Sequence, residues 1–167
     1  MTTLAIILAT AAYAGDVACG ESSQVWHDAH AVMQVARNRA LTNGRTLVQV
    51  LARPAQFAAP CSASARRRDL HLRHVLVGLR AIVGALDVPE GMDEARWFCA
   101  ERTPTWGCGA WRAPDSWARW RLVEVGATRW GGRVFHRYYR ERRPRARRMG
   151  GDVEARPAPL RPRRRAG

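Results

Sequence analysis

The apolar residues of the first half of the chain recur at the three- and four-residue spacing of helices. One such stripe predicts a helix from about Asp28 to Leu41, which Asn43-Gly44 would end. Thr46 is suited to cap a second, short helix over residues 47–52, and Pro54 would end it. The first half of the chain is therefore predicted to be helical.

A longer stripe in the middle of the chain predicts the helix that we expect to be buried in the core. Asp69 is suited to cap it, and residues 87–91 carry its stop signals. A linker rich in small residues and Arg, 61–68, precedes it. Its expected apolar face consists of Leu72, Val75, Leu76, Leu79, Ile82, Val83 and Leu86.

After Gly91 the pattern changes from helical to extended. Trp97-Phe98 and residues 121–125 are typical of short strands, and Gly131-Gly132 precedes a further strand or hairpin arm over Arg133 to Tyr139. We therefore expect an α+β fold that is mainly helical, with a small β-containing second half.

The two ends of the chain differ from the central domain, which is predicted to span residues 15–140. Residues 1–14 combine an apolar run with Ala12-Tyr13-Ala14 before Gly15, the pattern of a small-residue cleavage site. They are either a signal peptide or the first helix of the domain. Residues 141–167 are rich in Arg and Pro and almost lack large apolar side chains, so a disordered basic tail is expected.

The charge of the chain is strongly basic and unevenly placed. All 28 basic residues are Arg, and the net charge is +14. From Arg140 to Gly167 there are eleven Arg against three acidic residues, which is more than half of the net charge. Such a run is either simply solvated or attracts a polyanion, and nucleic acid and anionic envelope polymers are equally suitable.

The four cysteines form an even set that is compatible with two disulfides. Cys99 and Cys108 bracket a turn-rich stretch that would close a short loop, which leaves Cys19 and Cys61 as the other pair. Four cysteines allow three pairings, and four reduced thiols are the alternative. The Cys and His residues match no zinc motif, and neither a metal nor another cofactor is predicted.

Two features of the sequence suggest a binding or catalytic site. Six tryptophans gather among turns between Trp97 and Trp130; they either fill the core of the second half or line a groove in which sugar rings or bases stack. Glu21 stands between an apolar stretch and a Ser-rich turn, and desolvation at such a boundary favours a protonated carboxyl group, as a general acid requires. A surface carboxylate at a helix start is the alternative interpretation of Glu21.

Five short blocks of the sequence follow one another in a recognisable order. They are Cys19-Gly20-Glu21-Ser22 with Ala31–Arg39, Leu47–Phe57 ending in Pro54-Ala55-Gln56-Phe57, Ala95–Phe98, Ser116-Trp117 and Gly131–Phe135. In this order the chain resembles the SleB-type cell-wall hydrolases across about residues 17–139. The resemblance implies a lysozyme-like fold and cleavage of the β-1,4 glycan strand of peptidoglycan, in the manner of a lytic transglycosylase or a muramidase.

The resemblance also implies roles for individual residues. Glu21 would protonate the glycosidic oxygen and later accept a proton from the substrate's own 6-hydroxyl group. A two-carboxylate glycosidase would need a second acid, for which Glu101, Asp115 and Glu124 are candidates by region. The residues assigned to the glycan groove are Gln56, Trp106, Trp117, Arg133 and His136.

The chain departs from the family pattern at several positions. Cys19 replaces a Tyr, Val25 replaces a second Glu, and Arg133 takes the place of a His for which His136 would compensate. A different alignment makes Glu21 the second Glu of the motif and puts Val17 at the catalytic position, in an inactive protein.

We therefore expect a monomeric enzyme that degrades peptidoglycan, bacterial or phage-encoded, with the glycan strand as its partner. It would act outside the cytoplasm (secreted, periplasmic or attached to the cell wall), or accumulate in the cytoplasm if phage-encoded. The basic tail would hold anionic envelope polymers, and no specific nucleic acid is expected. The alternative is a non-catalytic protein that binds the envelope or nucleic acid through its tail.

Overall fold

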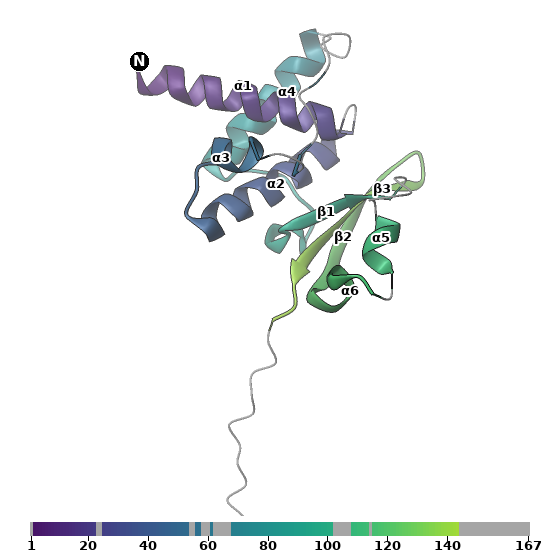
Figure 1. Ribbon diagram of the computed structural model, residues 1–167. Helices are drawn as coiled ribbons and strands as arrows, with labels where there is room; N and C mark the ends of the chain where they lie inside the picture. The colour runs from purple at the N-terminus through teal and green to yellow at the C-terminus, as the bar shows by residue number, and fades with distance from the viewer. Residues whose placement is uncertain are drawn as a thin grey trace, which may run out of the picture.

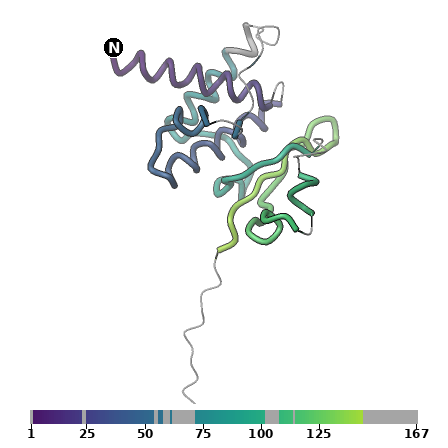
Figure 2. The backbone as a smooth tube through the Cα atoms, viewed as in Figure 1, coloured from purple at the N-terminus to yellow at the C-terminus, as the bar shows by residue number. Residues whose placement is uncertain are grey.

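The computed structural model describes residues 2–22, 25–53, 56–57, 61, 68–101, 108–113 and 115–143. Within them a group of helices adjoins a small antiparallel sheet, so the predicted α+β class is confirmed. Helices α1–α4 form one half of the molecule, and the sheet with α5 and α6 forms the other (Figures 1 and 2). In chain order the elements are α1 (Thr3–Ser22), α2 (Trp26–Asn43), α3 (Leu47–Leu51), α4 (Arg68–Val83), the 3-10 turn η1 (Met92–Glu94), β1 (Trp97–Ala100), α5 (Cys108–Arg112), α6 (Trp117–Arg121), β2 (Leu122–Trp130) and β3 (Arg133–Glu141).

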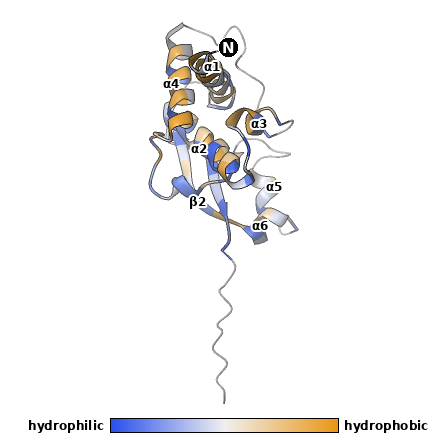
Figure 3. Ribbon diagram, turned by 90° about the vertical axis from the view of Figure 1, so that its left-hand side faces the viewer, coloured by the Kyte–Doolittle hydropathy of each residue, from blue (hydrophilic) through white to orange (hydrophobic). Residues whose placement is uncertain are grey.

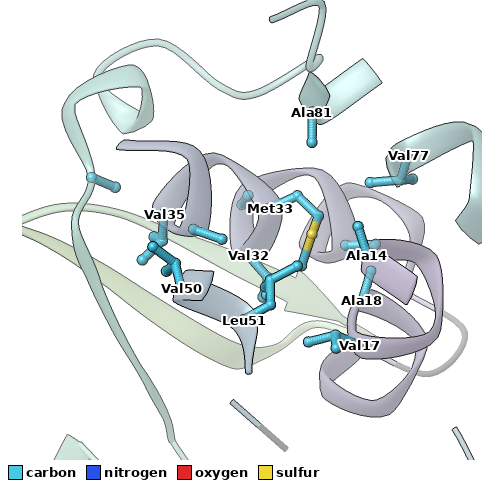
Figure 4. Packing of buried hydrophobic residues seen from close by; sticks show 14 of the residues in the cluster. Ala14, Val17, Ala18, Val32, Met33, Val35, Val50, Leu51, Val77 and Ala81 are labelled. Atoms are coloured by element: carbon cyan, nitrogen blue, oxygen red, sulfur yellow. The ribbon is translucent and has the colours of Figure 1, made fainter. Parts of the chain in front are cut away.

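The main hydrophobic core lies among the first four helices. Most of its side chains come from α1, α2, α3 and α4 and converge around Met33, which has no exposed surface (Figure 4). Met92, Ala95 and Tyr138 join the core from the second half of the chain. Hydrophobic residues dominate α1 and α4, whereas the sheet is more polar (Figure 3). The helical half therefore supplies most of the apolar burial that stabilises the fold.

Helices α1 and α4 approach each other closely because two glycines lie at their crossing. A Cβ atom on Gly15 would lie 2.8 Å from backbone atoms of His74 and Val75. A Cβ atom on Gly78 would overlap the carbonyl oxygen of Ala11. Only hydrogen at these two Cα atoms lets the backbones meet at this distance.

The predicted buried face of α4 is only partly correct. Leu72, Leu76 and Val83 are 60%, 53% and 73% exposed, whereas Val77 and Ala81 are buried. The other predicted residues, Val75, Leu79, Ile82 and Leu86, are half-buried. The close approach of α1 favours small side chains at the contact, so Val77 and Ala81 face the core and Leu72 and Leu76 lie outside it. The helix also begins at Arg68, before its predicted cap, and ends at Val83, before the predicted stop.

Local signals set the ends of the other helices much as predicted. Thr46 caps α3 in a capping box with Gln49. Helix α2 begins at Trp26, earlier than predicted, and ends where Gly44 adopts a left-handed φ of 59°. These ends depend on neighbouring residues alone, which is why the sequence pattern predicts them.

The sheet of the described chain has the strand order β1-β3-β2, with both pairs antiparallel. Gly131 and Gly132, with φ of 56° and 75°, form the turn between β2 and β3. Strand β2 extends beyond the predicted residue 125 to Trp130, with register shifts at Glu124/Gly126 and Ala127/Arg129. These irregularities interrupt the alternation of a regular strand and hide the extra length from the sequence pattern.

A buried carboxylate joins the two halves of the molecule. Asp28 of α2 has no exposed surface, and it accepts hydrogen bonds from Thr128 of β2 and from His136 and Tyr138 of β3. Burial, and then the charge of Asp28, raises the pKa of Tyr138 well above its usual value. The Tyr138 hydroxyl group therefore stays protonated and continues to donate.

Two disulfides connect segments of the described chain, Cys19 to Cys61 and Cys99 to Cys108. Of the three pairings that four cysteines allow, this is the one expected if Cys99 and Cys108 close a short loop. The separations in sequence are 42 and 9 residues, so the first closes a large loop and the second a small one.

The predictions for the two ends of the chain have different outcomes. Helix α1 runs without a break from Thr3 to Ser22, across the predicted cleavage site. Among the described helices α1 alone has the length and apolar composition to cross a membrane, a test that a core helix or a signal sequence also passes. Residues 144–167 of the predicted tail and 62–67 of the predicted linker lie outside the described residues.

We predict that Gly78→Ala destabilises the protein by about 1–3 kcal/mol, because the new methyl group would meet the α1 backbone, which cannot move aside cheaply. Urea unfolding at equilibrium measures this change. Gly109→Ala is the matched control, since a Cβ atom there meets nothing within 4 Å. Helix propensity alone would make both variants more stable, so a stabilised Gly78→Ala variant would contradict the close packing of α1 and α4.

Candidate active site

A pocket of about 620 Å³ lies where the helical half meets the sheet. It receives side chains from the end of α1, from α2, from the segment after α3, and from β1, α5 and β3. Its walls combine charged, polar and aromatic groups. The lining residues are Glu21, Arg39, Gln56, Phe57, Trp97, Phe98, Cys99, Ala100, Trp111 and His136.

Glu21 enters this pocket from the last turn of α1, where its side chain is half-buried. The close α1–α4 crossing and the nearby Cys19–Cys61 disulfide fix this end of the helix. Val17, one turn earlier, is buried in the hydrophobic core. Of the two positions that the alternative alignments make catalytic, it is thus Glu21 that reaches the pocket.

Arg39 of α2 contributes a guanidinium group to the pocket wall. Its Nε donates to the carbonyl of Arg96 at 2.6 Å, and a terminal nitrogen donates to Gln56 Oε1 at 3.3 Å. Its guanidinium carbon lies 4.7 Å from the Trp97 ring centroid, within range of a cation–π contact. Burial lowers the pKa of Arg39 to about 10, and the negative charge of Glu21 opposes that shift. Arg39 therefore holds a positive charge next to the acid.

Aromatic rings form much of the pocket wall. Trp97 and Trp111 line the pocket with their ring centroids 6.5 Å apart, and Trp117 packs behind them at 5.4 Å from Trp97. Phe57 and Phe98, 5.9 Å apart, continue the apolar wall. Flat aromatic faces beside hydrogen-bonding groups suit the apolar faces and hydroxyl groups of sugar rings.

His136 lines the pocket from β3 and is held by the buried Asp28. Its Nδ1 lies 2.7 Å from Asp28 Oδ2. Since an ionised carboxylate only accepts hydrogen bonds, Nδ1 is the nitrogen that donates. The neutral ring then has its lone pair on Nε2 and can accept a proton there.

The structure brings together three of the six residues that the sequence assigned to the site. Glu21, Gln56 and His136 line one pocket. Trp117 is 50% exposed and touches the pocket only through the other tryptophans. Arg133 is exposed at the β2–β3 turn, where it pairs with Trp130, and is not a lining residue. Trp106 lies outside the described residues.

The candidate second acids do not line the pocket. Glu101 accepts from Arg112 and Arg137, and Glu124 also accepts from Arg137. Burial disfavours the charge of Glu101, but these arginine hydrogen bonds outweigh it and lower its pKa. Among the described lining residues Glu21 is thus the sole carboxylate, and Asp115 lies elsewhere.

Sequence reasoning missed Asp28 and Arg39. It placed six tryptophans in a possible groove but selected Trp106 and Trp117, whereas Trp97 and Trp111 line the pocket. Asn38-Arg39 ends the block Ala31–Arg39 of the resemblance, which was a signal for Arg39, but no role was assigned to it. Asp28 gave no such signal, because its partners lie 100 or more residues away. In the described parts of the chain, no group of three or more His, Cys, Asp or Glu side chains is placed to hold a metal ion.

Comparison of the chain with known protein families, with curated proteins and with solved structures finds no match. The resemblance to SleB-type hydrolases therefore stays a prediction, and the case for a function depends on the pocket itself.

We predict that the Cys99–Cys108 disulfide holds the Trp111 wall in place, because it ties α5 to the pocket strand β1. Replacing both cysteines by Ala should speed hydrogen exchange of the α5 amides at least about tenfold, while α2 is unchanged. The Cys19→Ala/Cys61→Ala pair is the control and should affect the end of α1 instead. Equal protection of α5 in both variants would contradict this role.

Proposed function

We propose that this protein is a peptidoglycan-degrading enzyme that cleaves the β-1,4 glycan strand with Glu21 as general acid. The observation that carries the proposal is the position of Glu21 in a pocket walled by Trp97 and Trp111. An acid beside aromatic platforms matches what a glycosidic bond needs for cleavage: a proton for the leaving oxygen and a surface for the sugar rings.

The remaining lining residues fit this chemistry. Arg39 and Gln56 can donate hydrogen bonds to ring hydroxyl, acetamido or carboxylate oxygens of the glycan. The proton of Glu21 moves to the leaving oxygen and the glycosidic C–O bond breaks. A hydroxyl group of water or of the sugar then bonds to the sugar carbon and gives up its proton to a basic group of the pocket. Because the transition state is oxocarbenium-like, the carboxylate that Glu21 becomes also stabilises its positive charge.

The overall arrangement agrees with the fold that the resemblance implies. A helical half and a small antiparallel sheet meet at the pocket, and we propose that this is a SleB-like variant of the lysozyme-like fold. The burial of Val17 favours the alignment in which Glu21 is the catalytic residue. The paired cysteines favour a protein that works in an oxidising compartment outside the cytoplasm, since disulfides persist there.

A second candidate function, attachment to an anionic polymer without cleavage, is favoured by one surface. Arg96, Arg140, Arg142 and Arg143 gather with Glu94 and Glu141 around a shallow hollow at the end of β3, where the predicted tail begins. The surplus of guanidinium groups would attract phosphate or carboxylate groups of envelope polymers. This surface is compatible with an enzyme that is held at its substrate, so it does not compete with the pocket.

We predict that Glu21→Gln lowers the release of soluble muropeptides from purified sacculi at least about 100-fold, because Gln cannot supply the proton. Mass spectrometry of the digest measures the loss, and it separates anhydro from reducing-end products for the parent protein. Glu90→Gln is the matched control, since this exposed Glu lies outside the pocket.

Undiminished cleavage by Glu21→Gln would remove Glu21 from the mechanism. If the parent protein is retained on sacculi and releases nothing, the second candidate, a binding protein, is the better account.

A further inference from the structure

We propose that His136, positioned by Asp28, is the second proton-transfer group of the pocket and accepts the proton of the hydroxyl group that attacks the sugar. This inference rests on the proposed glycan cleavage. It assigns to an imidazole the part that a second carboxylate takes in two-acid glycosidases.

The need for such a group follows from the shortage of acids at the pocket. Glu21 is the sole carboxylate among its described lining residues, and the nearby Glu101 and Glu124 are paired with arginines on the sheet. In a displacement in which the two protons move together, Glu21 cannot accept one proton while it donates its own. His136 is the other lining residue with a basic atom suited to receive it.

The contacts of His136 fix the tautomer that a base requires. Asp28 is fully buried and holds His136 Nδ1 at 2.7 Å, so the ring proton stays on Nδ1 and the lone pair on Nε2. Tyr138 donates to the same carboxylate at 2.6 Å, and Thr128 donates as well. These donors hold the Asp28 carboxylate in place, so that it cannot turn away from the ring.

Aromatic neighbours fix the plane of the ring. The centroid of His136 lies 4.5 Å from Phe135, 5.2 Å from Phe98 and 6.4 Å from Tyr138, with all three contacts edge-on. The histidine is only 3% exposed. A ring with so little freedom keeps its orientation toward the pocket and pays little entropy when the substrate arrives.

The step balances without any further reactant. The glycosidic C–O bond breaks as the proton of Glu21 passes to its oxygen. A new C–O bond forms between the sugar carbon and the attacking oxygen, which is that of water or of the sugar's own 6-hydroxyl group. The proton of that hydroxyl moves to His136 Nε2, and the resulting imidazolium faces the Asp28 carboxylate, which stabilises the positive charge.

The same network would also be found if Asp28 served only to fasten the sheet to α2, and the test has to separate the two roles. The main variant is His136→Ala, assayed on sacculi with and without added imidazole. We expect the cleavage rate of the variant to be at least about 100-fold below that of the parent protein. Added imidazole should raise the rate of the variant at least about tenfold. His30→Gln, a buried histidine outside the pocket, is the control and should cleave like the parent protein.

Profiles of rate against pH provide the second readout. The titratable and charged groups around His136 are Asp28 and Arg39 of α2, Tyr138 of β3 and Glu21 of α1. The acidic limb of such a profile is the fall in rate toward low pH, and we expect His136→Gln to lose the limb that the parent protein shows. Asp28→Asn should move the acidic limb to lower pH, because Asn has no charge to stabilise the imidazolium. Tyr138→Phe should leave the acidic limb where it is in the parent protein. If His136→Ala does not fold, the His136→Gln profile decides.

The outcomes distinguish this inference from the proposed function. Wild-type rates for His136→Ala, together with an inactive Glu21→Gln, would overturn the role of His136 and leave Glu21 as acid. A loss that imidazole does not rescue, with an unaltered acidic limb, would show that the network is only structural. A parent protein that cleaves no glycan would overturn both proposals.

Discussion

The buried carboxylate of Asp28 is the interaction on which the rest of the structure depends. A charged group without exposed surface is destabilising unless every oxygen finds donors, and here the donors come from β2 and β3 while the acid belongs to α2. The sheet therefore has one position against the helices in which this group is satisfied. Because β1 pairs with β3, the same constraint also places Trp97 and Phe98 on the pocket wall.

A second constraint acts from the other side of the pocket. The glycine contacts between α1 and α4 determine how far α1 lies from the core, and the Cys19–Cys61 disulfide fixes its last turn. Glu21 is thereby presented to the pocket by a rigid element and not by a loop. Asn38 adds a tie between α2 and the segment before β1, since it donates to the carbonyls of Asp93 and Ala95 at 2.7 Å. The acid, the aromatic wall and the histidine are thus each held by contacts with rigid parts of the fold, as a site for chemistry requires.

How much of this could be predicted from the sequence depended on the range of the interactions involved. The cap at Thr46, the stop at Gly44 and the turn at Gly131-Gly132 are local and were predicted from neighbouring residues. The buried face of α4 was not, because hydrophobicity points to its leucines while the contact is set by the backbone distance that Gly15 and Gly78 allow. The partners of Asp28 lie 100–110 residues away in sequence, and only the folded chain brings them together.

The strongly basic composition has a consequence for the chemistry of the pocket. Arginines on the sheet bind most of the acids near it: Arg137 holds Glu101 and Glu124, and Arg140 and Arg143 hold Glu94. Such pairs at a surface contribute little stability, but they leave those carboxylates engaged and outside the pocket. Glu21 instead faces Arg39, which is itself restrained by the Arg96 carbonyl and the Trp97 ring. Glu21 is the one carboxylate among the described lining residues, so a second proton that moves while Glu21 donates its own needs an acceptor of another kind, and the imidazole that Asp28 orients is in place for it.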